Sequence, residues 1–220
     1  MFHFVIMNQA YTQFRKNMQD VKDLDTKFTN FNQANPNDDL TDLLRAEIVY
    51  SISAFDKLIH ELVKIGMIET FNGSRIETEK YRTFKVPIEI LLKIQNPLGT
   101  PPQFWLKQEI ERQHKLLSFQ EPDKVNDALN LISDKPHKWQ IIATQLGMTD
   151  KDVKIYLKNI VNRRNAIVHE ADEDAQTNQK TTIIQSDVAN DITFIENLGK
   201  AIYDLVTLAT QVVPNSSKKN

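Results

Sequence analysis

The sequence predicts an all-α protein, on the strength of three observations. Apolar residues recur at three- and four-residue steps over long stretches, which is typical of amphipathic helices. The alternation of apolar and polar residues that marks half-buried strands is almost absent. The 220 residues include only five glycines, although sandwiches, barrels and phosphate-binding loops use glycine at their turns.

Two long helices are expected in the first third of the chain, at residues 1–31 and 41–65. The first is indicated by apolar residues at helical spacing (Phe14, Met18, Val21, Leu24 and Phe28). The second has the clearest pattern of all (Leu44, Ile48, Ile52, Phe55, Ile59 and Leu62). The segment NQANPNDDLTD between them is a linker, Thr41 or Asp42 can cap the second helix, and Gly66 can end it.

The middle of the chain predicts shorter helices, after a polar stretch at residues 71–83. They are expected near residues 87–95, 102–118, 123–133 and 137–146, with breaks at PLGTPP and SDKP.

Two more long helices complete the chain. One begins near Thr149, whose hydroxyl can cap it, and runs towards His169. The other covers about 186–212 and follows an acidic, polar loop, EADEDAQTNQKT. We therefore expect a single helical domain over residues 1–212, with a helical insertion at about 67–135, and a flexible tail at 213–220.

Composition excludes several classes of protein. The absence of cysteine removes disulfides, thiolate metal sites and cysteine nucleophiles. The five histidines lack the spacing of zinc ligands (His3, His60, His114, His137 and His169). No Walker, GxGxxG or GxSxG motif is present either, so we expect no metal and no cofactor. The opening MFHFVIM lacks the basic region of a signal peptide, and no stretch approaches the ~20 apolar residues of a membrane span, so we expect a cytoplasmic protein without membrane contact.

The formal net charge of −2 hides a local asymmetry. Residues 141–169 carry five basic and two acidic side chains, whereas residues 170–200 carry two basic and seven acidic ones. A basic helix is therefore followed by an acidic loop, an arrangement that can direct an RNA backbone or can simply be solvated. The bulk charge does not exclude a nucleic-acid substrate.

The segment VNRRNAIVHEAD contains the residues best suited to chemistry, Arg163, Arg164, Asn165 and His169. The guanidinium group of arginine binds phosphate, and histidine transfers protons near neutral pH. Together they suffice for cleaving RNA without a metal. Five residues at about 100° each put Arg164 and His169 some 140° apart on an ideal helix, so a distorted helix end or a two-fold dimer would have to bring them into one cleft. In the alternative interpretation, both arginines are solvated charges near a helix end and His169 favours the helix dipole.

A second set of polar residues borders the apolar stripe of the helix at 41–65. Arg45, Asp56 and His60 fall along one edge of that stripe. Asp56 and His60, four residues apart, can pair and fix the imidazole. These three residues, and Arg163, can line a groove beside the site as substrate-binding or supporting residues. Alternatively, Asp56 and His60 form an ordinary salt bridge at the boundary of the apolar stripe.

These motifs resemble a known family. The run from Arg164 to His169 matches the R-x4-6-H motif of the HEPN superfamily, with the polar residue that commonly follows the arginine. Two longer blocks resemble the RiboL-PSP HEPN subgroup, LLRAEIVYSISAFDKLIHELV (43–63) and KWQIIATQLGMTDKDVKIYLKNIVNRRNAIVHEAD (138–172). Together they cover about a quarter of the chain.

The resemblance implies a HEPN-like helical bundle with additional helices that forms a homodimer around a composite active site. It implies an endoribonuclease that needs no metal and commonly leaves a cyclic phosphate, in which Arg164 holds the scissile phosphate and His169 is the general acid or base. Asn165 then orients the pair or hydrogen-bonds the substrate. Proteins of this family are often toxins or parts of antiviral defence, so an antitoxin or defence-system partner is expected. Some members have lost activity, and a catalytically inactive interaction or antitoxin-like module is the alternative.

Residues 138–162 also allow a different interpretation, a helix-turn-helix that reads DNA. Its second helix would carry Lys151, Lys154 and Lys158 into the major groove, although Asp150 and Asp152 stand where base contacts are usually made.

Overall fold

A computed structural model describes residues 2–96, 98–174 and 176–207 of the chain. This part of the chain is helical, as the sequence predicts, and its helices are α1 (Phe2–Ala34), α2 (Thr41–Phe71), α3 (Glu79–Arg82), α4 (Ile88–Gln95), α5 (Pro102–His114), α6 (Pro122–Leu129), α7 (Lys138–Leu146), α8 (Asp150–His169) and α9 (Gln185–Thr207). The described residues contain no strand, and they contain one isolated antiparallel bridge, between Glu173 and Lys180.

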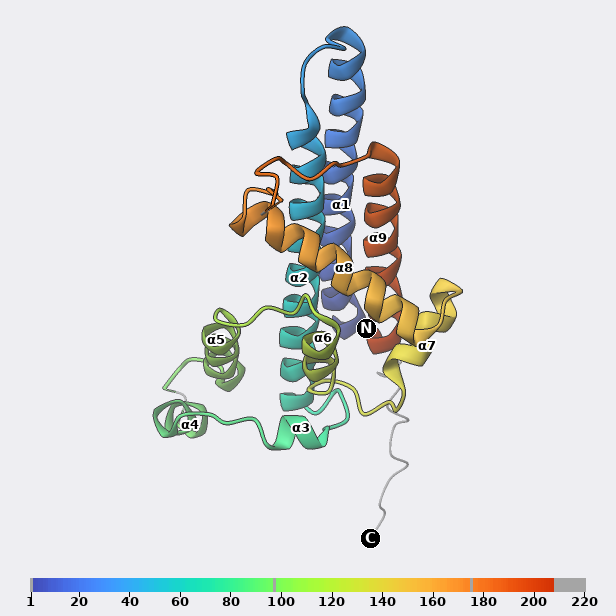
Figure 1. The fold of residues 1–220 in the computed structure, drawn as a ribbon. Helices are drawn as coiled ribbons and strands as arrows, with labels where there is room; N and C mark the ends of the chain where they lie inside the picture. The colour runs from blue at the N-terminus through green and yellow to red at the C-terminus, as the bar shows by residue number, and fades with distance from the viewer. Residues whose placement is uncertain (1, 97, 175, 208–220) are drawn as a thin grey trace.

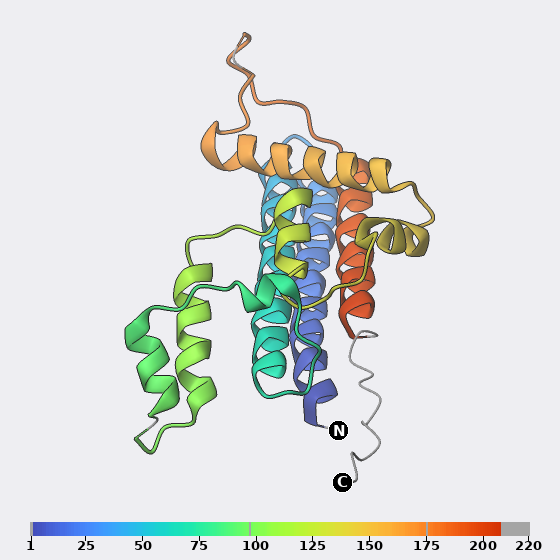
Figure 2. The same ribbon diagram turned by 90° about the horizontal axis from the view of Figure 1, so that it is seen from below.

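The three long helices α1, α2 and α9 lie side by side, and α8 crosses them (Figure 1). The second view shows the same crossing, with α6 beside α2 and α7 beside α9 (Figure 2). Helix α2 packs against α1, α5, α6, α8 and α9, and most of its apolar residues are buried. It is therefore the central helix, and α8 is held across it.

An arm made of α4 and α5 projects beside α2 in both views (Figures 1 and 2). Helix α5 packs against α2 through the buried residues Leu106 and Ile110, whereas α4 packs mainly against α5 and has no buried residue. The arm therefore covers one side of α2 and lies outside the bundle of α1, α2 and α9.

The expected end of the second helix at Gly66 is wrong. Helix α2 continues to Phe71, and Gly66 is buried inside it. A Cβ atom at this position would lie 2.6 Å from Cγ2 of Ile132, closer than real side-chain contacts allow. Gly66 therefore serves close packing against the segment after α6, and not helix termination.

One of the two expected helix caps is confirmed. The Thr149 hydroxyl accepts a hydrogen bond from the N–H of Asp152 and begins α8 as predicted. Thr41 does not cap α2, because its own N–H and hydroxyl donate to the carboxylate of Asp39 (3.0 and 2.5 Å). Asp39 thus satisfies the first turn from outside the helix.

Other boundaries differ by a turn or less. The polar stretch at 71–83 contains the short helix α3, which begins after the capping residue Thr78. The helix expected at 102–118 ends at His114, and the one expected at 123–133 covers Pro122–Leu129. The expected helix end at 212 and the tail at 213–220 lie outside the described residues. None of the helices in the described residues is long and apolar enough to cross a membrane.

Candidate functional site

The two adjacent arginines of α8 have different surroundings, and Arg163 lies in a buried charge cluster. Its Nη2 donates to Oδ2 of Asp172 at 2.8 Å, and the Nε of Arg45 on α2 donates to the same oxygen at 2.7 Å. The side chains of Arg45 and Asp172 are 7% and 1% exposed. We call Arg45, Arg163 and Asp172 the charge cluster.

The charge cluster holds the loop that follows α8. Ala171 and Asp172 both have left-handed backbone conformations, with φ of 53° and 59°, which non-glycine residues adopt at an energetic cost. The N–H of Asp172 donates to the carbonyl of Ala166, and its carbonyl accepts from the N–H of Thr181. The Arg163 and Arg45 guanidinium groups also donate to the carbonyl of Thr181. The chain is thus fastened to α2 immediately after His169.

Arg164 faces a different space, a cavity of about 420 Å3 between α2, α5 and α8. Its Nη1 donates to Oδ1 of Asn165 at 3.1 Å, while its Nε is buried without a hydrogen-bond partner. No carboxylate of the described residues pairs with it. A guanidinium group in this condition has donors available for an anionic ligand. Asn165 is the acceptor of the one side-chain hydrogen bond that Arg164 donates within the described residues.

Opposite Arg164, the cavity is lined by polar side chains from α2 and α5. The expected pair of Asp56 and His60 is present, with His60 Nε2 lying 3.6 Å from Asp56 Oδ2. The other oxygen of Asp56 accepts a hydrogen bond from the N–H of Phe119 at 2.6 Å. The carboxylate is therefore held at one oxygen by a backbone hydrogen bond, and His60 lies near the other oxygen.

His114 on α5 also lines the cavity, and the sequence reasoning missed it as a site residue. Its ring lies 5.8 Å from that of His60, and both rings contact Phe119. Burial, together with His60 and Lys64, lowers the pKa of His114 to about 4, so it is neutral at pH 7. Only the tertiary approach of α5 to α2 brings it here, and no spacing in the sequence indicates this.

Lysines add positive charge around the cavity. Lys64 is paired with Glu61 (2.7 Å) and Glu111 (3.2 Å), whereas Lys57 and Lys115 are exposed and free of carboxylates in the described structure. The two unpaired lysines line the same cavity as Arg164 and add positive charge for a phosphate-bearing ligand.

His169 is the last residue of α8 and is exposed to solvent. It does not line the cavity of Arg164. Because α8 stays helical through His169, the helix end does not distort in a way that would carry His169 to Arg164, and the two lie on different faces as the five-residue spacing predicts.

Arg45 is likewise separated from the other polar residues of α2. It lies eleven residues before Asp56, which is about 16 Å along a helix axis. The edge of α2 thus contributes to two places: Arg45 to the charge cluster, and Asp56 with His60 to the cavity.

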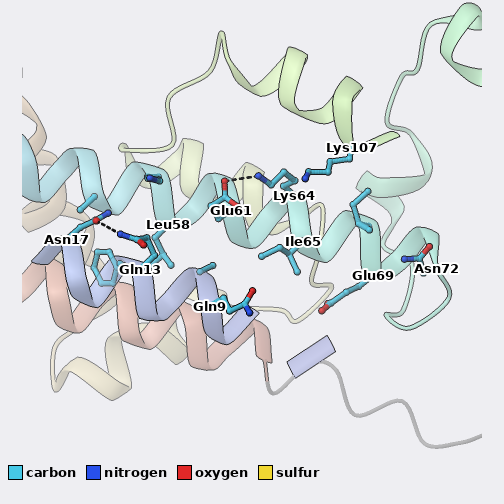
Figure 3. A pocket seen from close by; sticks show the side chains of 15 residues that line it. Gln9, Gln13, Asn17, Leu58, Glu61, Lys64, Ile65, Glu69, Asn72 and Lys107 are labelled. Atoms are coloured by element: carbon cyan, nitrogen blue, oxygen red, sulfur yellow. Dashed lines mark hydrogen bonds and ion pairs between the residues drawn. The ribbon is translucent and has the colours of Figure 1, made fainter. Parts of the chain in front are cut away.

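A second and larger cavity, of about 540 Å3, lies between α1 and α2 (Figure 3). Apolar side chains such as Leu58 and Ile65 line it, together with amides such as Gln9 and Gln13. It shares Lys57, Glu61 and Lys64 with the cavity of Arg164, but Arg164, His60 and His114 do not line it. The groups suited to proton transfer therefore gather on the α8 side of α2.

The helix-turn-helix interpretation has partial geometric support. Helices α7 and α8 meet at Gly147, which has φ of 66°, and the packing residues Ala143 and Val153 are buried. Lys154 is paired with Asp150 at 3.2 Å and lies over the ring of the buried Trp139.

Metal ligands do not gather anywhere in the described part of the chain, which holds no group of three or more His, Asp or Glu residues close enough to bind an ion.

A sequence model of the RiboL-PSP-HEPN family matches residues 12–208. No curated protein and no solved structure gives a significant match. The family match covers most of the chain and agrees with the all-α bundle, so the chain belongs to the RiboL-PSP-HEPN family.

Proposed function

We propose that this protein is a metal-independent endoribonuclease in which Arg164 holds the scissile phosphate. One observation carries the proposal: Arg164 lines a cavity and forms no ion pair with a carboxylate of the described residues, while its neighbour Arg163 is paired with Asp172. An unpaired arginine beside histidines is suited to stabilising the charge that develops on a phosphoryl group. Membership of a family associated with RNA chemistry supports this assignment.

His169 is proposed to transfer a proton to or from the reacting oxygens, with Asn165 orienting Arg164. The end of α8 suits this role, because the side chain of His169 is open to solvent there. Since His169 lies outside the cavity of its own Arg164, we propose a two-fold homodimer in which each copy's His169 approaches the other copy's Arg164. Arg45 and Arg163 support the site indirectly by fastening the loop after His169.

The biological setting proposed is that of a cytoplasmic toxin or antiviral-defence component, with a neutralising or activating partner. Uncontrolled RNA cleavage would harm the cell that makes the enzyme, which is the physical reason to expect such a partner.

The test is cleavage of single-stranded RNA by the purified protein in excess EDTA. We expect fragments ending in a 2′,3′-cyclic phosphate, and we expect Arg164→Ala and His169→Ala each to lose at least about 100-fold in rate. His137→Asn is the matched control, because His137 is exposed and its left-handed backbone (φ 54°) suits asparagine. If the wild-type protein cleaves no RNA, the ribonuclease proposal is wrong, and the alternative of a catalytically inactive interaction module is favoured.

DNA binding is the second candidate, and the geometry of α7, Gly147 and α8 is the observation that favours it. It predicts salt-dependent binding of duplex DNA that is lost in the Lys154→Ala, Lys158→Ala double variant. Unchanged RNA cleavage by that variant, without any duplex binding by the wild type, would remove this candidate.

A further inference from the structure

We propose that His60 is a second catalytic histidine, the general base that works with Arg164 inside one copy of the chain, and that Asp56 is its positioning residue. This inference rests on the proposed ribonuclease function and deepens it. His60, Asp56 and Arg164 line the same cavity, formed by α2 and α8 of a single chain. His169 does not line it. The cavity thus contains its own imidazole, whatever a second copy adds.

Asp56 is itself held in place. Its Oδ1 accepts the N–H of Phe119 at 2.6 Å, and its Oδ2 lies 3.6 Å from Nε2 of His60. The backbone at Phe119 belongs to the segment between α5 and α6, so this connecting segment determines how the carboxylate points. A carboxylate oriented in this way favours the tautomer with the proton on the nitrogen that faces it. The imidazole of His60 is then left with Nδ1 as its proton acceptor.

The Nδ1 atom of His60 has no hydrogen-bond partner in the described structure, and its side chain is 22% exposed. The ring is fixed by Phe119, with centroids 4.4 Å apart, and by His114 at 5.8 Å. His114 is neutral at pH 7 because burial lowers its pKa, so it adds no positive charge beside His60. The ring is therefore packed on its faces and open at the nitrogen that would accept a proton.

The proposed step balances without a co-reactant. The 2′-hydroxyl of the RNA gives its proton to Nδ1 of His60, and its oxygen forms a bond to phosphorus. The bond between phosphorus and the 5′-oxygen breaks, and the leaving oxygen takes a proton from the protonated imidazole of His169. Arg164 stabilises the charge on the phosphoryl oxygens. The products are a 2′,3′-cyclic phosphate and a 5′-hydroxyl, and solvent returns both histidines to their starting states.

The experiment measures single-turnover cleavage of a single-stranded RNA in EDTA by His60→Ala, His60→Gln, Asp56→Asn and His137→Asn. We expect both His60 variants to lose about 100-fold or more, because a general base contributes about that much. Asp56→Asn should lower kcat with little change in KM, since it misorients the base without touching RNA. His137→Asn should retain the wild-type rate.

Chemical rescue separates catalysis from folding. Free imidazole should restore part of the rate of His60→Ala, because the truncated side chain leaves room in the cavity for the base. It should not restore Arg164→Ala. Full activity of both His60 variants, with activity still lost in His169→Ala, would overturn this inference and leave the proposed function standing. Absence of imidazole rescue in a folded, inactive His60→Ala protein would also overturn it. A wild-type protein that cleaves no RNA would overturn both.

Discussion

Arg163 and Arg164 are consecutive residues of one helix, yet the fold uses them in opposite ways. Arg163 points to the charge cluster, where it shares a buried carboxylate with Arg45. Arg164 points to a cavity in which no carboxylate meets it and one of its nitrogens is buried without a partner. The comparison teaches that residue type does not decide whether an arginine is structural or available to a ligand. The nearest carboxylate decides it.

The charge cluster should be the more sensitive region for stability, and Asp172→Ala tests it most strongly. The change removes the buried counter-ion of Arg45 and leaves only the exposed Asp42, at 3.5 Å, so we expect a loss of about 3–5 kcal/mol in the free energy of unfolding. Urea denaturation measures it. Glu173→Gln, at the exposed neighbouring position, should change stability by less than about 0.5 kcal/mol. Equal urea midpoints for Asp172→Ala and Glu173→Gln would show that the charge cluster does not stabilise the folded protein.

The two arginines can be compared directly. Arg164→Ala should reduce RNA cleavage by at least about 100-fold and leave stability nearly unchanged, because its side chain pairs with no acid. Arg163→Ala should lower stability by about 1–3 kcal/mol, since it removes one of two charged hydrogen bonds to a buried carboxylate, and should reduce cleavage far less. Cleavage rates and urea denaturation of both variants measure the two effects, on catalysis and on stability. A larger catalytic loss in Arg163→Ala would reverse the assignment.

The same contrast shows what the sequence could and could not predict. Helical periodicity predicted the positions of α2, α7 and α8 and the cap at Thr149, because these depend on local spacing and local hydrogen bonds. The pairing of Asp56 with His60 was also predictable, since four residues form one helical turn. The role of Gly66 was not, because the atom that excludes a side chain there belongs to Ile132, far along the chain.

The sequence also could not predict that the polar residues of α2 belong to two separate places, the charge cluster and the cavity of Arg164. Arg45 and His60 lie on one edge of α2, and only the path of the loop after α8 determines that Asp172 meets the first of them. His114 reaches the cavity because α5 packs on α2, a contact that leaves no periodic signal in the sequence. Residues that act across elements thus escape reasoning from spacing.

Glu47 extends the comparison to a buried carboxylate that has no cation. Both of its oxygens are buried without partners, and burial, with a smaller effect of Asp25, raises its pKa to about 8. The folded state therefore holds this proton more tightly than the unfolded state does. The stability it confers is complete below the unfolded pKa, near 4.5, and is lost as the pH rises through about 8.

We therefore expect the wild-type protein to lose about 1–2 kcal/mol more than Glu47→Gln between pH 7 and pH 9, at about 1.4 kcal/mol per pH unit. Urea denaturation at both pH values gives the difference. Glu121→Gln, which changes an exposed carboxylate, should follow the wild-type curve. Parallel pH curves for Glu47→Gln and the wild type would mean that Glu47 is not held protonated.

The smallest effect is expected at the other end of α8. The charge cluster fixes its C-terminal end through buried ions, whereas two exposed hydrogen bonds between the Thr149 hydroxyl and Asp152 form at its N-terminal end. Thr149→Ala should therefore cost only about 1 kcal/mol, and Thr149→Ser, which keeps the oxygen, should cost much less. Because the cap lies fifteen residues before Arg164, neither variant should change the cleavage rate of folded protein. A catalytic loss in Thr149→Ala that Thr149→Ser does not share would mean that the position of Arg164 depends on both ends of α8, and not on the charge cluster alone.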